Sequence, residues 1–219
     1  MYKAIYTKSK TFLETTVMII VLVLLPLLGN KEVYASWQVW TVVFSVYLLN
    51  LSNPAHSIKE SRMKTESDGI SMLVLLVLAI LAFLLPLLDY TYGSVVKIPA
   101  HYSFLGLLIM ILGLTIRYYA VMTLGKFFDV KVRIQKNHQL IKTGLYKYIR
   151  HPSYTGILLT SFGCCLVLRS VLGLLFSLTI YFSAFIYRIH LEEKVLVRHF
   201  KEEYTKYSQQ TKKLIPFLF

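Results

Sequence analysis

The sequence is poor in acidic residues and in cysteine. Asp and Glu number 11 against 24 Lys and Arg in 219 residues, which gives a formal net charge of +13. The two cysteines, Cys164 and Cys165, are adjacent inside an apolar run, so they cannot form a disulfide framework, and no metal-ligand spacing accompanies them. We expect them to be small apolar side chains within a helix, and we predict no metal site.

Several motifs of soluble enzymes are also missing. No Gly-x-Gly-x-x-Gly follows a strand-like pattern, no P-loop is present, and no His-Glu-x-x-His occurs. These absences argue against a Rossmann-type dinucleotide site, a P-loop phosphate site and a zinc-protease site. The spacing of Ser, His and Asp gives no basis for a catalytic triad.

Long apolar runs dominate what is present. Apolar residues make up 56% of the chain, and the mean hydropathy is +0.57. Such runs are typical of an integral membrane protein. We predict apolar segments at residues 12–28, 37–51, 70–88, 102–124, 156–168 and 171–187. The predicted fold is all-α, a polytopic integral membrane protein with about five to six transmembrane helices.

The last two apolar segments are separated by Arg169-Ser170, which predicts a C-terminal helical hairpin. The arm at 156–168 is shorter than the roughly 20 residues that span a bilayer. It is therefore either partly inserted or lengthened by the residues around Pro152. The first apolar segment is predicted to be an uncleaved span, because no small-residue cleavage site follows it.

Basic residues alternate between loops, so membrane topology explains the net charge better than nucleic-acid binding does. Several Lys or Arg residues occur near the N-terminus, at 56–68, at 125–154 and in the tail from Arg188. The alternate loops carry one each: Lys31, Lys97 and Arg169. The positive-inside rule then predicts that the N-terminus, the 125–154 segment and the tail are cytoplasmic. The compact, lysine-rich chain suggests a prokaryotic cell membrane.

The stretch from Gly144 to Gly156 is unlike lipid-facing sequence. It combines basic side chains with Tyr146, Tyr148 and Tyr154 between two apolar segments. Polar groups beside hydrocarbon are costly, so such a cluster is a site hypothesis. Pro152 suits the first turn of a helix, which places Arg150 and His151 at a helix N-terminus that favours anions.

Each candidate residue also has a plainer interpretation. Arg188 and Glu192 are four residues apart and share a helix face, but Arg188 could equally be a juxtamembrane anchor. His138 could be a solvated loop residue, and His151 a helix cap. Arg117, within the 102–124 segment, either extends to the interface or faces a polar cavity.

The order of these motifs is more specific than any one of them. His138-Gln-Leu-Ile precedes Gly144-x-Tyr146 and Arg150-His-Pro-Ser-Tyr154-x-Gly156, and Arg188-x-x-x-Glu-Glu193 follows the hairpin. This pattern resembles the isoprenylcysteine carboxyl methyltransferase family, which is similar to membrane phospholipid methyltransferases. The resemblance covers roughly residues 120–219. It implies N-terminal transmembrane helices at 1–124 and a cofactor-binding catalytic region at 125–219.

The resemblance also implies S-adenosylmethionine, bound without a Rossmann domain in a cytoplasmic cavity under the hairpin. The implied cofactor contacts are His138, Gln139, Leu140, Ile141, Tyr146, His151, Pro152, Ser153, Tyr154 and Glu192. Arg188 matches the arginine that binds the substrate carboxylate, and Arg188 and Glu192 are the implied catalytic residues. Lys131 departs from the pattern, because eukaryotic members carry a cofactor-contacting glutamine there.

These residue types suit methyl transfer to a carboxylate. The reaction is an in-line displacement that depends on positioning, and a carboxylate is already ionised at neutral pH. Arg188 can bind a carboxylate bidentately, and Glu192 can neutralise the positive end of the cofactor. The Pro152 helix N-terminus and His151 can bind the methionine carboxylate, and tyrosine rings favour a sulfonium through cation–π attraction.

The predicted function is carboxyl O-methylation of a prenylated cysteine or a similar lipid-like acid that enters from the membrane. A first alternative is methylation of a phospholipid amine, a thiol or an isoprenoid. A second is a non-enzymatic membrane protein on the same fold. The predicted partners are the lipid bilayer and a lipid-like or prenylated substrate, not nucleic acid. The sequence does not indicate an oligomeric state.

Overall fold

The computed structural model describes residues 30–53, 69–93, 96–129, 134 and 137–215. The predicted apolar segment at 12–28 lies outside these ranges. Lys131, which replaces the glutamine of eukaryotic family members, also lies outside them. The described residues form helices and two isolated bridges, but no β-strand. This agrees with the all-α prediction.

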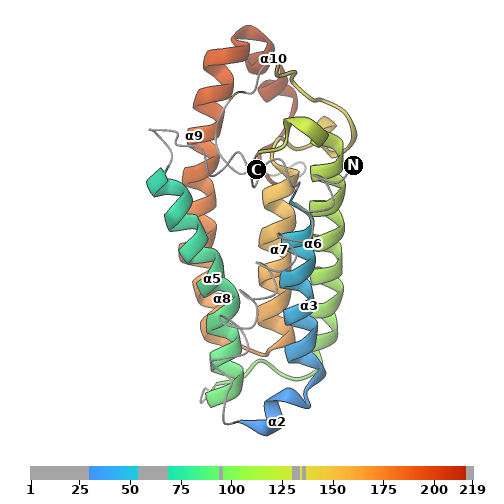
Figure 1. The fold of residues 1–219 in the computed structure, drawn as a ribbon, viewed down its shortest axis with the longest axis vertical. Helices are drawn as coiled ribbons and strands as arrows, with labels where there is room; N and C mark the ends of the chain where they lie inside the picture. The colour runs from blue at the N-terminus through green and yellow to red at the C-terminus, as the bar shows by residue number, and fades with distance from the viewer. Residues whose placement is uncertain (1–29, 54–68, 94–95, 130–133, 135–136, 216–219) are drawn as a thin grey trace, which may run out of the picture.

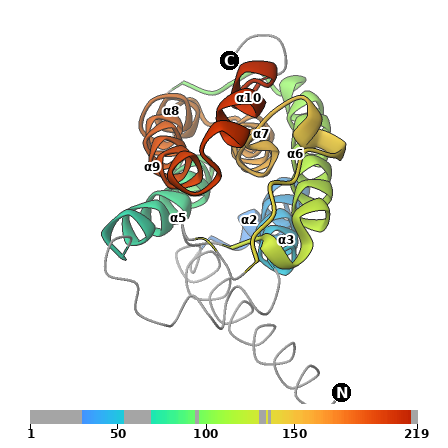
Figure 2. The same cartoon turned by 90° about the horizontal axis from the view of Figure 1, so that it is seen from above.

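The helices form an elongated bundle (Figure 1). In chain order they are α2 (Lys31–Tyr34), α3 (Trp37–Leu51), α5 (Gly69–Tyr92), α6 (Tyr102–Leu124), η3 (Gly125–Phe127), η4 (Gly144–Lys147), α7 (Pro152–Val167), α8 (Val171–Phe176), η5 (Ser177–Tyr181), α9 (Phe182–Phe200) and α10 (Glu202–Gln210). Here η3 and η4 are 3-10 turns and η5 is a π-helical turn. Seen from above, α5, α8 and α9 lie opposite α3 and α6, with α7 beside α6 (Figure 2).

Three of these helices are long and apolar enough to cross a membrane. They comprise Leu73–Tyr92, Tyr102–Phe127 and the continuous run Val171–Phe200. Two shorter apolar helices, Trp37–Leu51 and Pro152–Val167, lie among them. The chain is therefore a polytopic helical membrane protein, as predicted, although two of its described apolar helices are short.

The C-terminal hairpin differs in detail from its predicted bounds. Its first arm, α7, begins at Pro152, so the residues around this proline lengthen the arm predicted at 156–168. The apolar part of the second arm was predicted to end at residue 187, and beyond it α9 continues through the charged tail to Phe200 as one helix. This continuation keeps Arg188 and Glu192 on a single rigid helix. The domain division between residues 124 and 125 stays a prediction.

Glycines bring α6 and α7 into close contact. A Cβ atom on Gly113 would lie 2.6 Å from the backbone nitrogen of Thr160, and one on Gly156 would lie 2.7 Å from that of Arg117. Gly106 and Gly163 meet in the same way nearer the hairpin turn. Small residues at such positions allow the backbones of two membrane helices to touch. The contact holds Arg117 of α6 against the first turn of α7.

Candidate functional site

A cavity of about 330 Å³ lies between α6, α7 and α9 and the segment that follows η3. All predicted site residues except Pro152 line it. They are His138, Gln139, Leu140, Ile141, Tyr146, His151, Ser153, Tyr154, Arg188 and Glu192. Pro152 is the first residue of α7 and is buried behind this wall. The fold therefore gathers the predicted residues around one cavity, while their individual roles stay predictions.

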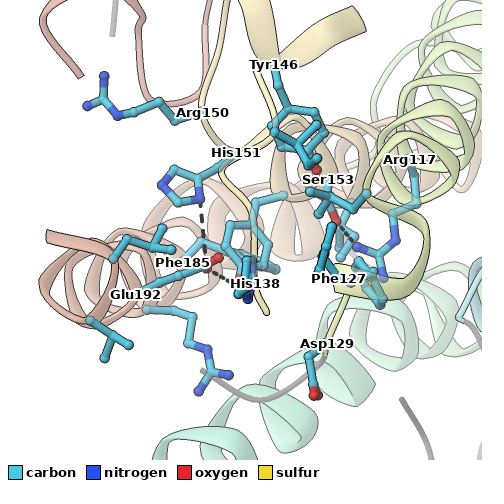
Figure 3. Close-up of a pocket in the computed structure, with 18 of the residues that line it drawn as sticks. Arg117, Phe127, Asp129, His138, Tyr146, Arg150, His151, Ser153, Phe185 and Glu192 are labelled. Atoms are coloured by element: carbon cyan, nitrogen blue, oxygen red, sulfur yellow. Dashed lines mark hydrogen bonds and ion pairs between the residues drawn. The ribbon is translucent and has the colours of Figure 1, made fainter. Parts of the chain in front are cut away.

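Glu192 of α9 lies beside the N-terminus of α7. The Tyr154 hydroxyl donates to Glu192 Oε2 over 2.8 Å, and His151 Nδ1 lies 3.8 Å from the same oxygen. The His151 and Tyr154 rings are stacked at 5.7 Å. Figure 3 shows His151 and Glu192 on one side of the cavity and Arg117 and Ser153 on the other. A carboxylate thus lies beside a helix N-terminus, and both border the same space.

A second carboxylate on α9 binds behind this pair. Arg150 Nε donates to Glu193 Oε1 over 2.7 Å, and His151 Nε2 lies 3.4 Å from that oxygen. Arg150 Nη1 also donates to the carbonyl oxygens of Ser208 and Thr211. The sequence placed Arg150 at a helix N-terminus, but it did not predict the pair with Glu193, which was given no role. In the structure they connect the α7 N-terminus to α9 and to the segment after α10.

The segment after α10 lies against the same part of the chain. The backbone N–H of Arg150 donates to Lys212 O over 2.7 Å, and that of His151 donates to Lys213 O over 3.0 Å. The Thr155 hydroxyl donates to Leu214 O over 2.8 Å. These bonds fix the backbone at the mouth of α7, next to the predicted cofactor contacts His151, Pro152, Ser153 and Tyr154.

Arg188 lies in the interior, with an exposed fraction of 2%. It is one helical turn before Glu192 on α9, and both residues line the cavity. The alternative that Arg188 is an interfacial anchor is therefore wrong. A buried cation beside a cavity can bind an anionic ligand group, which a surface arginine does poorly.

Arg117 also faces the cavity and was absent from the predicted site. Its exposed fraction is 5%, Nη1 donates to Ser153 Oγ, and Nη2 donates to Asn53 Oδ1 over 2.7 Å. The guanidinium carbon lies 4.9 Å from the centre of the Phe128 ring. Its Nε makes no hydrogen bond to any residue that the structure describes. The sequence signal was an arginine within an apolar helix, which marks a functional position by default.

His138 lines the cavity and lies between two aromatic rings. Its ring stacks on Phe127 at 5.0 Å and meets Phe200 edge-on at 5.7 Å. Burial lowers the pKa of His138 below its usual 6.5, the charge of His199 lowers it further, and Glu192 opposes the shift. His138 is therefore neutral near pH 7, and the solvated-loop alternative is wrong.

A smaller cavity of about 180 Å³ adjoins the first, between α3, α5 and α7. Most of its lining is apolar, from residues such as Val46, Leu49, Phe83 and Leu84. Six residues line both cavities: Asn53, Leu76, Ala79, Arg117, Ile157 and Tyr181. A charged cavity is thus continuous with an apolar one inside the membrane-spanning part of the bundle.

No group of three or more His, Cys, Asp or Glu residues within the described ranges is arranged to hold a metal ion. The larger cavity is instead lined by cations, carboxylates and aromatic rings together with aliphatic side chains such as Leu140, Ile157 and Leu196. Fold and site together define a polytopic helical membrane protein with a polar ligand cavity next to an apolar one.

Comparison with known proteins gives the family. Residues 105–198 match the model of the isoprenylcysteine carboxyl methyltransferase (ICMT) family. The protein-S-isoprenylcysteine O-methyltransferase of Saccharomyces cerevisiae is 36% identical over 140 residues, which cover 63% of this chain and 57% of that protein. Protein-S-isoprenylcysteine O-methyltransferase B of Arabidopsis thaliana is 32% identical over 145 residues, which cover 63% of this chain and 73% of that protein. The chain belongs to the isoprenylcysteine carboxyl methyltransferase family.

A solved structure agrees with this assignment at the level of the fold. The eukaryotic intramembrane Ras methyltransferase ICMT superposes with a TM-score of 0.57 and 24% sequence identity, over 92% of this chain and 73% of that one. The match to the yeast enzyme spans little more than half of that enzyme's length. The family is one of methyltransferases, which as a class use a methyl donor.

Proposed function

We propose that this chain is an integral membrane methyltransferase that uses S-adenosylmethionine. Its acceptor is the carboxylate of a prenylated cysteine or of a similar lipid-like acid. One observation carries the proposal: Arg188 and Glu192 are one turn apart on α9 and line the same cavity, with Arg188 buried. A cation for the acceptor and a carboxylate for the donor are therefore fixed on one rigid element.

The residues present fit the methyl donor. The cavity volume of about 330 Å³ is within the range of small-molecule sites, roughly 300–1,000 Å³. Glu192 is placed to neutralise a positively charged end of the donor. The α7 N-terminus and His151 are placed for its carboxylate. The segment from His138 to Ile141 also lines the cavity. When bound, S-adenosylmethionine supplies an electrophilic methyl group on a sulfonium.

The protein residues then act by holding the acceptor. Arg188 binds the acceptor carboxylate and orients one oxygen towards the methyl carbon. The donor, held by Glu192 and the α7 N-terminus, would supply its methyl group to that oxygen, and its sulfur would keep the electron pair of the broken S–CH₃ bond. No proton moves, because the carboxylate is already ionised at neutral pH. Catalysis here is positioning and charge placement, and it needs no general base.

The second buried arginine favours an acid acceptor over an amine. Arg117 lines both cavities, and its Nε has no partner among the described residues. A buried donor without a partner is costly, and an acceptor carboxylate would satisfy it. Two buried cations next to the acceptor position would repel the head group of a cationic amine. This disfavours the phospholipid-amine alternative.

The apolar cavity supports entry of the acceptor from the membrane. It adjoins the charged cavity at Arg117, so an acid bound there could extend its hydrocarbon chain into apolar surroundings. We also propose that the N-terminus and the catalytic end are cytoplasmic. Lys97 and Arg169, the single basic residues of alternate loops, lie together at the opposite end, where Arg169 donates to Ile98 O. A prokaryotic origin stays a prediction, since the relatives named above are eukaryotic.

The decisive experiment is transfer of labelled methyl from S-adenosylmethionine to N-acetyl-S-farnesylcysteine by the purified protein in lipid. Base-labile label in the acceptor establishes a carboxyl methyl ester. Arg188→Ala should abolish transfer and leave donor binding largely intact, whereas Arg198→Ala, an exposed position on the same helix, should change neither. Equal loss of transfer and donor binding in Arg188→Ala would contradict the role proposed for Arg188. Failure of the unmodified protein to bind the donor would favour the non-enzymatic alternative.

A further inference from the structure

One stripe of α9 and η5 joins the charged cavity to the apolar one. Glu192, Arg188, Phe185 and Tyr181 follow each other at helical spacing, and all four line the larger cavity. With a rise of 1.5 Å per residue, Tyr181 lies about 10 Å along the helix from Arg188, on the side away from Glu192. An acid held at Arg188 would therefore place its hydrocarbon chain beside Tyr181.

Tyr181 occupies the boundary between the two cavities. Its exposed fraction is 1%, and it lines both of them. The ring meets Phe185 edge-on at 4.9 Å and packs in one cluster with Ala82 of α5. Its hydroxyl makes no hydrogen bond to another described residue. Tyr181 therefore contributes the size of its ring at this boundary, and not a hydrogen bond.

The backbone at Tyr181 has an unusual conformation. Residues Ser177–Tyr181 form a π-helical turn between two α-helices. The Ser177 hydroxyl lies 3.0 Å from Ser161 Oγ and 3.5 Å from Cys165 Sγ on α7, so the turn is bonded to the other arm of the hairpin. Single π turns inside α-helices are rare and occur frequently at functional sites. Tyr181 is the last residue of this turn, and it is the only aromatic residue among the six that line both cavities. The turn therefore sets the direction of its ring.

We propose that Tyr181 is a specificity-determining residue. Its ring sets the width of the passage between the carboxylate-binding cavity and the apolar cavity, so that a slim isoprenoid chain passes and a bulkier hydrocarbon does not. This inference rests on the proposed carboxyl methylation. It concerns which acids are accepted, and not how the methyl group is transferred.

The test compares two acceptors in the same preparation. One is N-acetyl-S-farnesylcysteine, and the other is its counterpart in which the last isoprene units are replaced by a biphenyl group. The ratio of their kcat/KM values is independent of the fraction of protein that is folded. Tyr181→Leu and Tyr181→Ala should raise the ratio in favour of the biphenyl acceptor by at least about tenfold, the usual effect of reshaping an apolar pocket. Tyr181→Trp should shift it the other way.

Two controls separate ring size from other effects. Tyr181→Phe keeps the ring and removes the hydroxyl, so it should leave the ratio within about twofold of the unmodified protein. Leu178→Ala changes an exposed residue of the same π turn and should also leave it unchanged. A ratio that stays constant across the Leu, Ala and Trp variants overturns the inference, even though methyl transfer itself continues. Absence of transfer to either acceptor by the unmodified protein counts against the prenylated-cysteine acceptor in the proposed function, and the inference falls with it.

Discussion

Arg150 Nε lies 2.7 Å from Glu193 Oε1, and this ion pair joins the residue before His151 to α9. The side chains are 9% and 16% exposed. Glu192 and Glu193 are neighbours in the chain, yet one lines the cavity and the other supports the wall behind it. Of the two adjacent glutamates, Glu192 thus borders the cavity and Glu193 supports the α7 N-terminus.

Loss of this support should destabilise the protein. Arg150→Ala leaves a largely buried carboxylate without its main partner, and we expect a loss of about 3 kcal/mol. Glu193→Gln keeps a hydrogen-bond acceptor and should cost less. Thermal unfolding of the purified protein in detergent measures both. Lys142→Ala removes the exposed ion pair with Glu203, at 2.8 Å, and should cost no more than about 1 kcal/mol. Equal effects of Arg150→Ala and Lys142→Ala would contradict a supporting role.

Arg117 should matter for the acceptor and not for the donor. Arg117→Ala removes a buried cation from the boundary of the two cavities. Loss of one charged hydrogen bond, worth about 1.5–3 kcal/mol, corresponds to roughly a tenfold to hundredfold fall in kcat/KM for the acid acceptor. Donor affinity, measured by binding of labelled S-adenosylmethionine, should change little. Tyr118→Ala, the exposed neighbour on α6, is the matched control. If Arg117→Ala lowers donor affinity as much as it lowers kcat/KM, the claim that Arg117 acts on the acceptor alone is wrong.

The lowered pKa of His138 predicts a loss of stability in acid. In the folded protein His138 binds its proton less readily than in the unfolded chain, mainly because of burial. Between the usual pKa of about 6.5 and the lowered folded value, the unfolded chain holds more protons, so stability falls as pH falls through this window. His138→Asn should reduce the fall in Tm between about pH 7 and pH 5. His190→Asn, at an exposed position, should leave the fall unchanged.

The glycine contact between α6 and α7 should not tolerate a side chain. A methyl group at Gly113 would lie 2.6 Å from the Thr160 nitrogen, which is backbone and cannot rotate away. Gly113→Ala should therefore destabilise the protein by about 1–3 kcal/mol, as overpacking does. It should also reduce transfer, because the same contact places Arg117. Thr115→Ala, on an exposed part of α6, is the control for both measurements. If Gly113→Ala unfolds at the same temperature as the unmodified protein, the two helices can move apart to accommodate the methyl group, and the prediction is wrong.

The sequence predicted the parts of the site that depend on local order along the chain. Pro152 does begin α7, and the four-residue spacing of Arg188 and Glu192 does place both on one helix face towards the cavity. These predictions succeeded because helix starts and helix periodicity are properties of short segments. The burial of Arg188 could not be predicted in this way, because it depends on helices from other parts of the chain.

Other features of the site depend on contacts between helices that are distant in the chain, and these could not be predicted from the sequence. The direction of Arg117 depends on how closely α6 approaches α7, and the glycines alone did not indicate which helix they would meet. The π turn at Ser177–Tyr181 has no distinctive residue pattern, because serine, leucine, threonine, isoleucine and tyrosine all fit an ordinary apolar helix. The different tasks of Glu192 and Glu193 likewise follow from the positions of Arg150 and Tyr154 across the bundle.

The bonds from Arg150 and His151 to Lys212 and Lys213 also bear on how the protein is made. A ribosome completes α7 well before it reaches Lys212, so the backbone at the mouth of that helix must wait for its partners during synthesis. Until then the Leu214 side chain, 1% exposed in the finished fold, has not reached its buried place. The backbone at the mouth of α7 therefore gains these hydrogen bonds only after α9 and α10 have been made.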